Sequence, residues 1–342
     1  MQTKTTLGGR KFDVVGDKVY HSYRIGQPQT NGVYVKLPHE GSGGYGDVKQ
    51  EYESYHKINS YLRMPLIRKI RDVDGVEILI IQKLAGEMIG DLLLRNPENA
   101  SLCLERYAYD LQKMWRATVK PIKESMLAVN QRSGYTKRLE SFFYFRETER
   151  FLTTPTIING TQYKHPGEML EKVLQSLRSR TDSVMTLGHG DDHLANILTD
   201  VTGDSLNYYI IDPKLAGFYP PAISYLNTAM YLLMYKYTYA IKEVIDGNKI
   251  QLDYSVMNKP AHSSYGIIDV LQIMEHGLLE LNGGFGMFRE YAIANLLRFV
   301  QHLNDPKNFH HTKPNQLGYL ALAIELASNK YHTISEVYAS IR

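Results

Sequence analysis

Two side chains that could take part in phosphoryl transfer stand five positions apart in the segment from His189 to Leu198. Asp191 comes first, and Asn196 directly precedes an apolar run that is typical of a strand. A phosphotransferase needs a carboxylate beside the acceptor hydroxyl and, a short loop away, an amide oxygen that can help to hold Mg²⁺ on the nucleotide phosphates. The spacing therefore makes Asp191 a candidate base and Asn196 a candidate metal ligand.

The residues after Asn196 predict a β-hairpin that brings a second carboxylate to the same place. Residues 196–199 and 206–211 have the pattern of strands, and turn formers separate them. Because the start of the first strand of a hairpin lies beside the end of the second, Asn196 and Asp212 should meet at its open end. Mg²⁺ commonly takes only one or two oxygen ligands from protein, and phosphates and water complete its shell. Asp212 is therefore the second candidate metal ligand.

The same polar segment is open to other interpretations. It could be a plain polar surface loop, since an Asp and an Asn at this spacing also arise by chance. Its two histidines and two aspartates could instead bind a transition metal in a hydrolase. Such sites usually need further ligands at set spacings, and the remaining histidines show no such pattern. A metal-dependent hydrolase stays a minor alternative.

Composition limits the class of protein and its partners. The 342 residues suffice for one large or two ordinary domains, and 43% hydrophobic residues allow a sizeable core. The 39 basic and 36 acidic residues are too balanced and too scattered to indicate nucleic acid or a membrane surface as a partner. The single Cys103 excludes an internal disulfide and fits a reducing compartment. Without an apolar run of about 20 residues or a signal-peptide core, we expect a cytoplasmic protein of unknown oligomeric state.

The elements that must position these residues divide the chain into two parts. Up to residue 85 the sequence is strand-rich, with strands predicted at 12–15, 18–25, 33–37 and 77–84 and one helix at 48–62. Beyond Gly86 helical patterns dominate, at 102–119, 135–153, 166–180, 224–245, 267–281, 287–303, 317–328 and 334–341. The expected fold is α+β, with a small antiparallel-sheet lobe over residues 1–85 and a larger, mainly helical lobe over residues 86–342. A cleft between two lobes is a natural ligand site.

The first lobe offers a lysine and a glutamate for nucleotide phosphates. Lys36 lies in an alternating strand, where it could be either a solvated surface lysine or a phosphate contact. The following helix has two glutamates that could hold it. Glu51 shares the apolar helix face, whereas Glu53 lies on the polar one, so Glu51 should point inward. That face is formed by Tyr55, Ile58 and Leu62.

Two further segments of the first lobe could contact a nucleotide. The apolar strand 78–84 leads into a glycine-containing connection, and the backbone groups of Lys83 and Leu84 could pair with an adenine edge. Residues 41–46 match the pattern G-x-G-x-x-G. Four residues including a proline separate Lys36 from the first of these glycines, however, which does not fit a dinucleotide-binding turn. We expect a loop there that could close over phosphates.

Taken together, these residues resemble the aminoglycoside phosphotransferase and choline kinase group of protein-kinase-like enzymes. The catalytic loop of that family reads close to His-Gly-Asp-x-His-x-x-Asn-x-Leu, as residues 189–198 do, and its metal segment is an apolar strand ending in Asp, here 210–212. The resemblance covers roughly residues 14–230. It implies a two-lobed protein-kinase-like fold whose first lobe binds the nucleotide. The implied roles are catalytic base for Asp191, Mg²⁺ ligands for Asn196 and Asp212, phosphate contact for Lys36 with its partner Glu51, and hinge contacts for Lys83 and Leu84.

The function implied by the resemblance is transfer of the γ-phosphoryl group of ATP or GTP, with Mg²⁺, to a hydroxyl of a small molecule of the aminoglycoside, sugar or amino-alcohol type. A non-catalytic kinase-like module that binds a nucleotide or a protein is the main alternative. His189 and His193 are expected to be scaffolding. The chain departs from the family at Asp192, where an apolar residue is common, and at residues 224–226, where Ser-Tyr-Leu replaces a frequent Asp-Leu-Ala. The second departure leaves open how the loop is braced.

Overall fold

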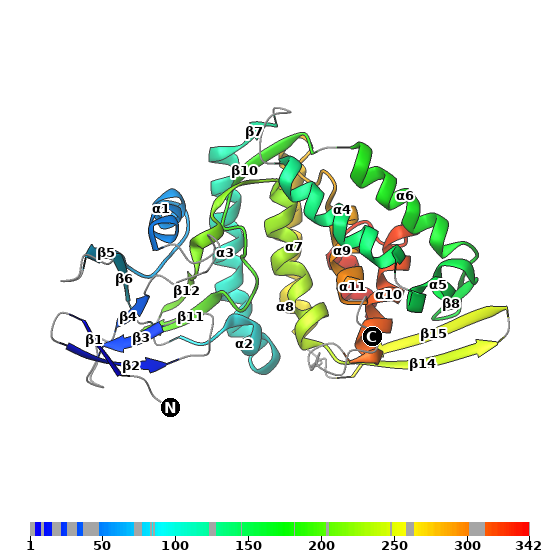
Figure 1. Cartoon of the computed structure of the whole chain (residues 1–342), viewed down its shortest axis with the longest axis horizontal. Helices are drawn as coiled ribbons and strands as arrows, with labels where there is room; N and C mark the ends of the chain where they lie inside the picture. Colours follow the sequence, from blue (N-terminus) through cyan, green and yellow to red (C-terminus); the bar gives the residue numbers. More distant parts are fainter. Residues whose placement is uncertain are drawn as a thin grey trace.

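Strands dominate the start of the chain and helices the rest in the computed structural model (Figure 1). The structure describes residues 4–7, 10–15, 22–25, 33–36, 48–71, 77–82, 84, 86–122, 128–144, 146–180, 182–202, 205–246, 248–257, 263–300 and 312–341. None of the helices that these residues form is long and apolar enough to cross a membrane.

The N-terminal part contains a six-stranded antiparallel sheet in the order β1-β2-β3-β4-β6-β5. Its strands are β1 (Lys4–Leu7), β2 (Arg10–Val15), β3 (Ser22–Ile25), β4 (Val33–Lys36), β5 (Ile67–Arg71) and β6 (Glu77–Gln82). The strands predicted at 12–15, 18–25 and 33–37 correspond to β2, β3 and β4, which pair in this order as an antiparallel meander. Helix α1 (Val48–Ile58) packs on β5 and β6, and together they form a small apolar core of Val48, Tyr55, Ile67, Leu79 and Ile81.

A larger apolar core lies among the helices that follow. These are α2 (Ile89–Arg95), α3 (Pro97–Thr118), α4 (Ala128–Tyr144), α5 (Arg146–Thr153), α6 (Pro166–Ser179), α7 (Pro221–Tyr231), α8 (Ser263–Glu280), α9 (Phe288–Val300), α10 (Lys313–Ala327) and α11 (Ile334–Ser340). Helix α3 starts where the Asn96 side chain accepts a hydrogen bond from the backbone N–H of Asn99, with Pro97 at its first position. Its buried face, which includes Leu104, Leu111 and Trp115, packs against α8.

The centre of the molecule contains the strands that carry the candidate loop. Strand β10 (Val184–Gly188) lies between β7 (Lys120–Pro121) and β13 (Gly217–Tyr219). The predicted hairpin is confirmed as β11 (Ile197–Thr202) and β12 (Ser205–Ile210), with a longer first strand and a shorter turn than the sequence pattern indicated. A short 3₁₀ helix, η1 (Pro213–Leu215), follows it and packs against α1. The loop between β10 and β11 and the end of β12 therefore lie where the two parts of the chain meet (Figure 1).

The prediction of one helix over residues 224–245 was wrong. Helix α7 ends at Tyr231, a π-helical turn η2 (Leu232–Lys236) follows, and the chain continues as strand β14 (Tyr239–Asp246), which pairs with β15 (Lys249–Val256). Aromatic and β-branched residues favour a strand here. Strands β8 (Thr156–Ile158) and β9 (Thr161–Tyr163) complete this sheet. Where the sequence predicted one helix at 135–153, the structure has two helices, α4 and α5.

Candidate active site

The loop after β10 makes a sharp turn that only glycine accommodates. Gly190 has φ +84°, and a Cβ built on it would lie 2.6 Å from the carbonyl oxygen of Leu215. The turn directs the following residues out of the sheet. The backbone N–H of Asn196 then donates to the carbonyl of His193 (2.8 Å), which closes the loop before β11 begins.

Asp191 and Asn196 are held together by the loop itself. The Asn196 side-chain amide donates to the backbone carbonyl of Asp191 (2.7 Å), so its nitrogen is engaged and its oxygen is the group that remains for a ligand. The Asp191 side chain is 37% exposed, and its Oδ1 lies 3.7 Å from Nε2 of His193. His193 accepts a hydrogen bond from the Ala195 N–H at Nδ1 and stacks on Tyr231. The ring therefore supports the loop beside the carboxylate.

His189 ties the loop to the strand that precedes Asp212. It is fully buried, and its Nε2 lies 2.9 Å from the carbonyl oxygen of Ile211, while its Nδ1 accepts from the Asp191 N–H (3.4 Å). Burial lowers the pKa of His189. A neutral ring protonated at Nε2 satisfies both contacts, which agrees with the expected scaffolding role.

Asp212 follows β12 in a left-handed backbone conformation, with φ 60° and ψ 56°. Asp is among the non-glycine residues that tolerate this region. The Ile211 N–H donates to the carbonyl of Asn196 (2.9 Å), so the hairpin brings the two expected metal ligands to its open end. Both line a cavity of about 620 Å³, which we call the hinge-side cavity. Its wall also includes Glu51, Ile67, Ile81, Leu84, Gly86, Met88 and Leu198.

The predicted residues of the first part of the chain fall into three groups. Glu51 is buried and Leu84 half-buried in the hinge-side cavity wall, whereas Glu53 is exposed beside Lys49, as the helix face indicated. The backbone of Lys36 pairs with that of Leu79. The side chain of Lys36, the whole of Lys83 and residues 41–46 lie outside the described residues.

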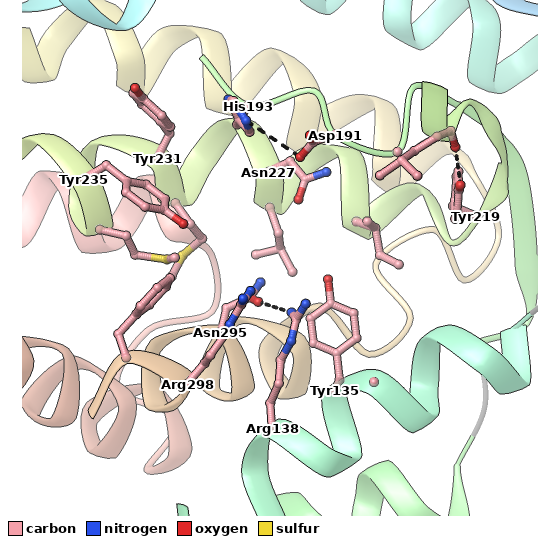
Figure 2. Close-up of a pocket in the computed structure, with 18 residues that line it drawn as sticks. Tyr135, Arg138, Asp191, His193, Tyr219, Asn227, Tyr231, Tyr235, Asn295 and Arg298 are labelled. Carbon is pink, nitrogen blue, oxygen red and sulfur yellow. Dashed lines mark hydrogen bonds and ion pairs between the residues drawn. The ribbon is translucent and has the colours of Figure 1, made fainter. Parts of the chain in front are cut away.

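A second cavity of about 470 Å³ is lined by Gly190, Asp191 and His193 of the loop (Figure 2). We call it the Asp191 cavity, because Asp191 lies in its wall together with residues of α4, α7, η2 and α9. Tyr135, Arg138 and Arg298 enter it from the wall opposite Asp191 (Figure 2). Sequence reasoning missed these three residues, since α4 and α9 carry no motif and lie far from the loop in sequence.

Asp192, the unexpected acidic residue of the loop, is fully buried. Its carboxylate accepts hydrogen bonds from the Tyr107 hydroxyl (2.8 Å) and from the Asn227 amide (2.9 Å), and its carbonyl accepts one from the Thr228 hydroxyl (3.1 Å). A buried carboxylate needs such partners. These bonds join the loop to α3 and α7, so Asp192 acts as the brace of the loop.

The other departure in the sequence begins at Ser224, on α7. Ser224 is buried beside the end of β10, where its Oγ would lie 3.0 Å from a Cβ at Gly188. The question of how the loop is braced, which the sequence left open, is therefore answered by the hydrogen bonds of Asp192.

The donor set at the open end of the hairpin suits a hard cation that shares its shell with another molecule. Among the described residues, no three Asp, Glu, His or Cys side chains are grouped so as to hold a metal ion. The Asn196 amide oxygen and the Asp212 carboxylate are both oxygen donors in the wall of one cavity. Mg²⁺ accepts two such protein ligands when phosphate oxygens and water supply the rest.

The sequence matches no protein-family model, and no curated protein matches it. Solved structures match it in fold. A putative aminoglycoside phosphotransferase from Ralstonia eutropha has a TM-score of 0.54 at 12% identity, with 96% of this chain and 93% of that chain covered. The GDP complex of aminoglycoside 2'-phosphotransferase-IIIa has a TM-score of 0.50 at 12% identity, with 96% and 94% covered.

A third similar structure is a thermostable mutant of aminoglycoside phosphotransferase APH(4)-Ia in a ternary complex with ADP and hygromycin B. Its TM-score is 0.50 at 12% identity, and 95% of each chain is covered. Such low identities carry information about the fold alone. The expected protein-kinase-like α+β fold and the resemblance to the aminoglycoside phosphotransferases are confirmed at that level.

Proposed function

We propose that this protein is a kinase that moves the γ-phosphoryl group of ATP or GTP to a hydroxyl of a small molecule. The observation that carries the proposal is the position of the loop between two cavities. Asp191 lies in the wall of one, and Asn196 and Asp212 lie in the wall of the other. A phosphoryl group held at the metal ligands would thus be next to a hydroxyl held at Asp191.

The hinge-side cavity is the proposed nucleotide site. Its wall is mostly apolar near Ile67, Ile81 and Leu198, which suits a base, and polar near Asn196 and Asp212, which suits phosphates. In this proposal residues 1–85 form the nucleotide-binding lobe and residues 86–342 the catalytic and acceptor-binding lobe. Two of the similar phosphotransferases were solved with GDP or ADP, which supports a nucleotide here.

The roles of the remaining nucleotide contacts follow from the sequence argument and from the sheet register. Lys36 is the proposed phosphate contact and Glu51 its partner: Lys36 stands opposite Leu79 in the sheet, and Leu79 packs beneath the helix that carries Glu51. Lys83 and Leu84 are proposed to present backbone groups to the base. Mg²⁺, when bound at Asn196 and Asp212, would neutralise charge on the transferred group.

Asp191 is the proposed base because it alone of the two adjacent aspartates is accessible. Its side chain is 37% exposed, whereas Asp192 is fully buried and already accepts two hydrogen bonds. In the reaction the acceptor oxygen bonds to the γ-phosphorus while the bond from that phosphorus to the bridging oxygen breaks. The acceptor proton passes to the Asp191 carboxylate, and the nucleoside diphosphate leaves with the electron pair of the broken bond.

The test is a transfer screen with labelled ATP and GTP against pools of hydroxylated metabolites and antibiotics. Asp191→Asn should lower kcat by about 10²- to 10⁴-fold, the range for general base catalysis, with nucleotide affinity kept. Asp212→Asn should weaken Mg²⁺-dependent nucleotide binding by about 10-fold or more. Asp246→Asn is the matched control, because Asp246 is exposed at the end of β14.

Two outcomes would contradict the proposal. Full transfer by Asp191→Asn with every acceptor would remove Asp191 from the chemistry. Nucleotide binding that stabilises the protein against heat, with no transfer or hydrolysis under any condition, would instead identify a non-catalytic binding module.

A further inference from the structure

The Asp191 cavity has a charge pattern that restricts what it can bind. Asp191 is the only acidic side chain among the described residues that line it, whereas Arg138 from α4 and Arg298 from α9 both contribute to its wall. Figure 2 shows the two guanidinium groups on the side of the cavity opposite Asp191. An acceptor whose hydroxyl lies at Asp191, the proposed base, would therefore face the positive charges of Arg138 and Arg298 across the cavity.

The two arginines differ in how they are held: Arg138 is fixed by its neighbours, whereas Arg298 is exposed. Arg138 is half-buried, donates from Nη1 to the Asn295 side chain (2.6 Å), and lies 4.8 Å from the centre of the Tyr135 ring. Arg298 is at the rim, 5.5 Å from the centre of the Phe299 ring. Burial lowers the pKa of Arg138, and the nearby charge of Arg298 acts in the same direction.

Like charges that approach each other in a partly closed cavity repel, and the repulsion is relieved by an anion placed between them. A guanidinium also offers paired N–H donors that match the oxygens of a carboxylate or a phosphate. A ligand with several ammonium groups would instead add to the repulsion between the two arginines. Tyr135, Tyr231 and Tyr235 add ring surface and hydroxyls for a hydroxylated carbon skeleton.

We propose that the acceptor is a hydroxylated anion, whose carboxylate or phosphate group binds Arg138 and Arg298 while its hydroxyl faces Asp191. This inference rests on the proposed kinase function and narrows it. It sets the chain apart in substrate class from phosphotransferases that act on polycationic antibiotics, although the fold is shared.

The experiment compares probes that have one skeleton and different charge: glucose, glucosamine, glucuronate and a glucose phosphate, with the corresponding glycerol series beside them. Binding is measured by calorimetry without nucleotide, and transfer is measured separately with labelled ATP or GTP. At least one anionic probe should bind about 10- to 100-fold more tightly than its neutral counterpart, the range for one or two charge-assisted hydrogen bonds. The carboxylate and phosphate arms distinguish the two kinds of anion.

Arg138→Gln and Arg298→Gln should each raise KM and Kd for the anionic probe toward those of the neutral one, with kcat changed less. Arg298→Lys keeps the charge and should keep part of the preference; as a rim residue, position 298 also tolerates substitution if Arg138→Gln fails to fold. Lys137→Gln is the matched control, because Lys137 is exposed on α4 beside Arg138 and does not line the cavity.

The outcomes separate this inference from the function on which it rests. Preference for the neutral or the ammonium probe, or equal binding of all members of each series, overturns the anionic acceptor. If Asp191→Asn leaves transfer intact, the kinase mechanism is wrong, yet the charge preference can still be read from binding alone. Loss of preference in Lys137→Gln as large as in Arg138→Gln would also overturn the inference.

Discussion

Removing the Asp192 carboxylate should destabilise the fold and disable the loop together. The carboxylate is fully buried and accepts from Tyr107 (2.8 Å) and Asn227 (2.9 Å). In Asp192→Ala both donors lose their buried partner, at about 1–3 kcal/mol each, so the free energy of unfolding should fall by about 2–6 kcal/mol. Tyr107→Phe removes one hydrogen bond to a charged group and should cost about 1.5–3 kcal/mol.

A double-mutant cycle isolates the bond between the two side chains. In the Asp192→Ala background the Tyr107 hydroxyl has already lost its acceptor, so Tyr107→Phe should be nearly neutral or stabilising. The coupling energy should therefore be about 1.5–3 kcal/mol. The single Trp115 is buried on the same helix as Tyr107, and its fluorescence in a urea titration reports unfolding.

Both proposed effects of Asp192, on stability and on the loop, can be refuted. Strictly additive effects of the two substitutions would show that the carboxylate and the hydroxyl do not stabilise each other. The effect on the loop is tested by kcat, measured at urea concentrations well below the midpoint of unfolding. It should fall in Asp192→Ala, because Asp191 loses its fixed neighbour. A variant that is destabilised as expected but retains full kcat would confine Asp192 to a role in stability.

Three further outcomes are expected. Gly86→Ala should destabilise the protein by about 1–3 kcal/mol and weaken nucleotide binding, because its Cβ would lie 1.7 Å from the Thr199 carbonyl; a neutral result in urea titration would contradict the close approach. Burial lowers the pKa of His189, so below about pH 6.5 the unfolded chain takes up a proton that the folded chain does not. The free energy of unfolding should therefore decline below that pH by up to about 1.4 kcal/mol per pH unit for this group. The substitution His189→Gln should reduce this slope. Burial raises the pKa of Cys103, so a thiol reagent should label it only as fast as the protein unfolds; rapid labelling of the native protein would disagree.

Local patterns predicted those parts of the site that depend on neighbours in sequence. The hairpin that joins Asn196 to Asp212 follows from two strands and a turn, and the inward position of Glu51 follows from one helix face. The strand at 239–246 was missed because its apolar residues also fit a helical spacing. Only pairing with β15 decides between the two, and that is a tertiary effect.

Contacts between distant segments could not be predicted in this way. The acidic side chain at Asp192 was visible as a departure, but its partners Tyr107 and Asn227 lie 85 and 35 residues away on separate helices. Arg138 and Arg298 similarly line one cavity only because α4 packs against α9. Neither position belongs to a motif, so the charge of the cavity is a property of the tertiary fold.

Helix α7 has two tasks that constrain how the protein can diversify. It supplies Asn227 to the brace of the loop, and it also supplies Ile223, Leu226 and Met230 to the wall of the Asp191 cavity. A mutation on this helix that changes the cavity wall should therefore also shift Asp191, the proposed base. On the opposite wall Arg138 donates a hydrogen bond to Asn295, and none of the described contacts of this pair involves the loop. Acceptor selectivity should therefore change mainly through substitutions on α4 and α9.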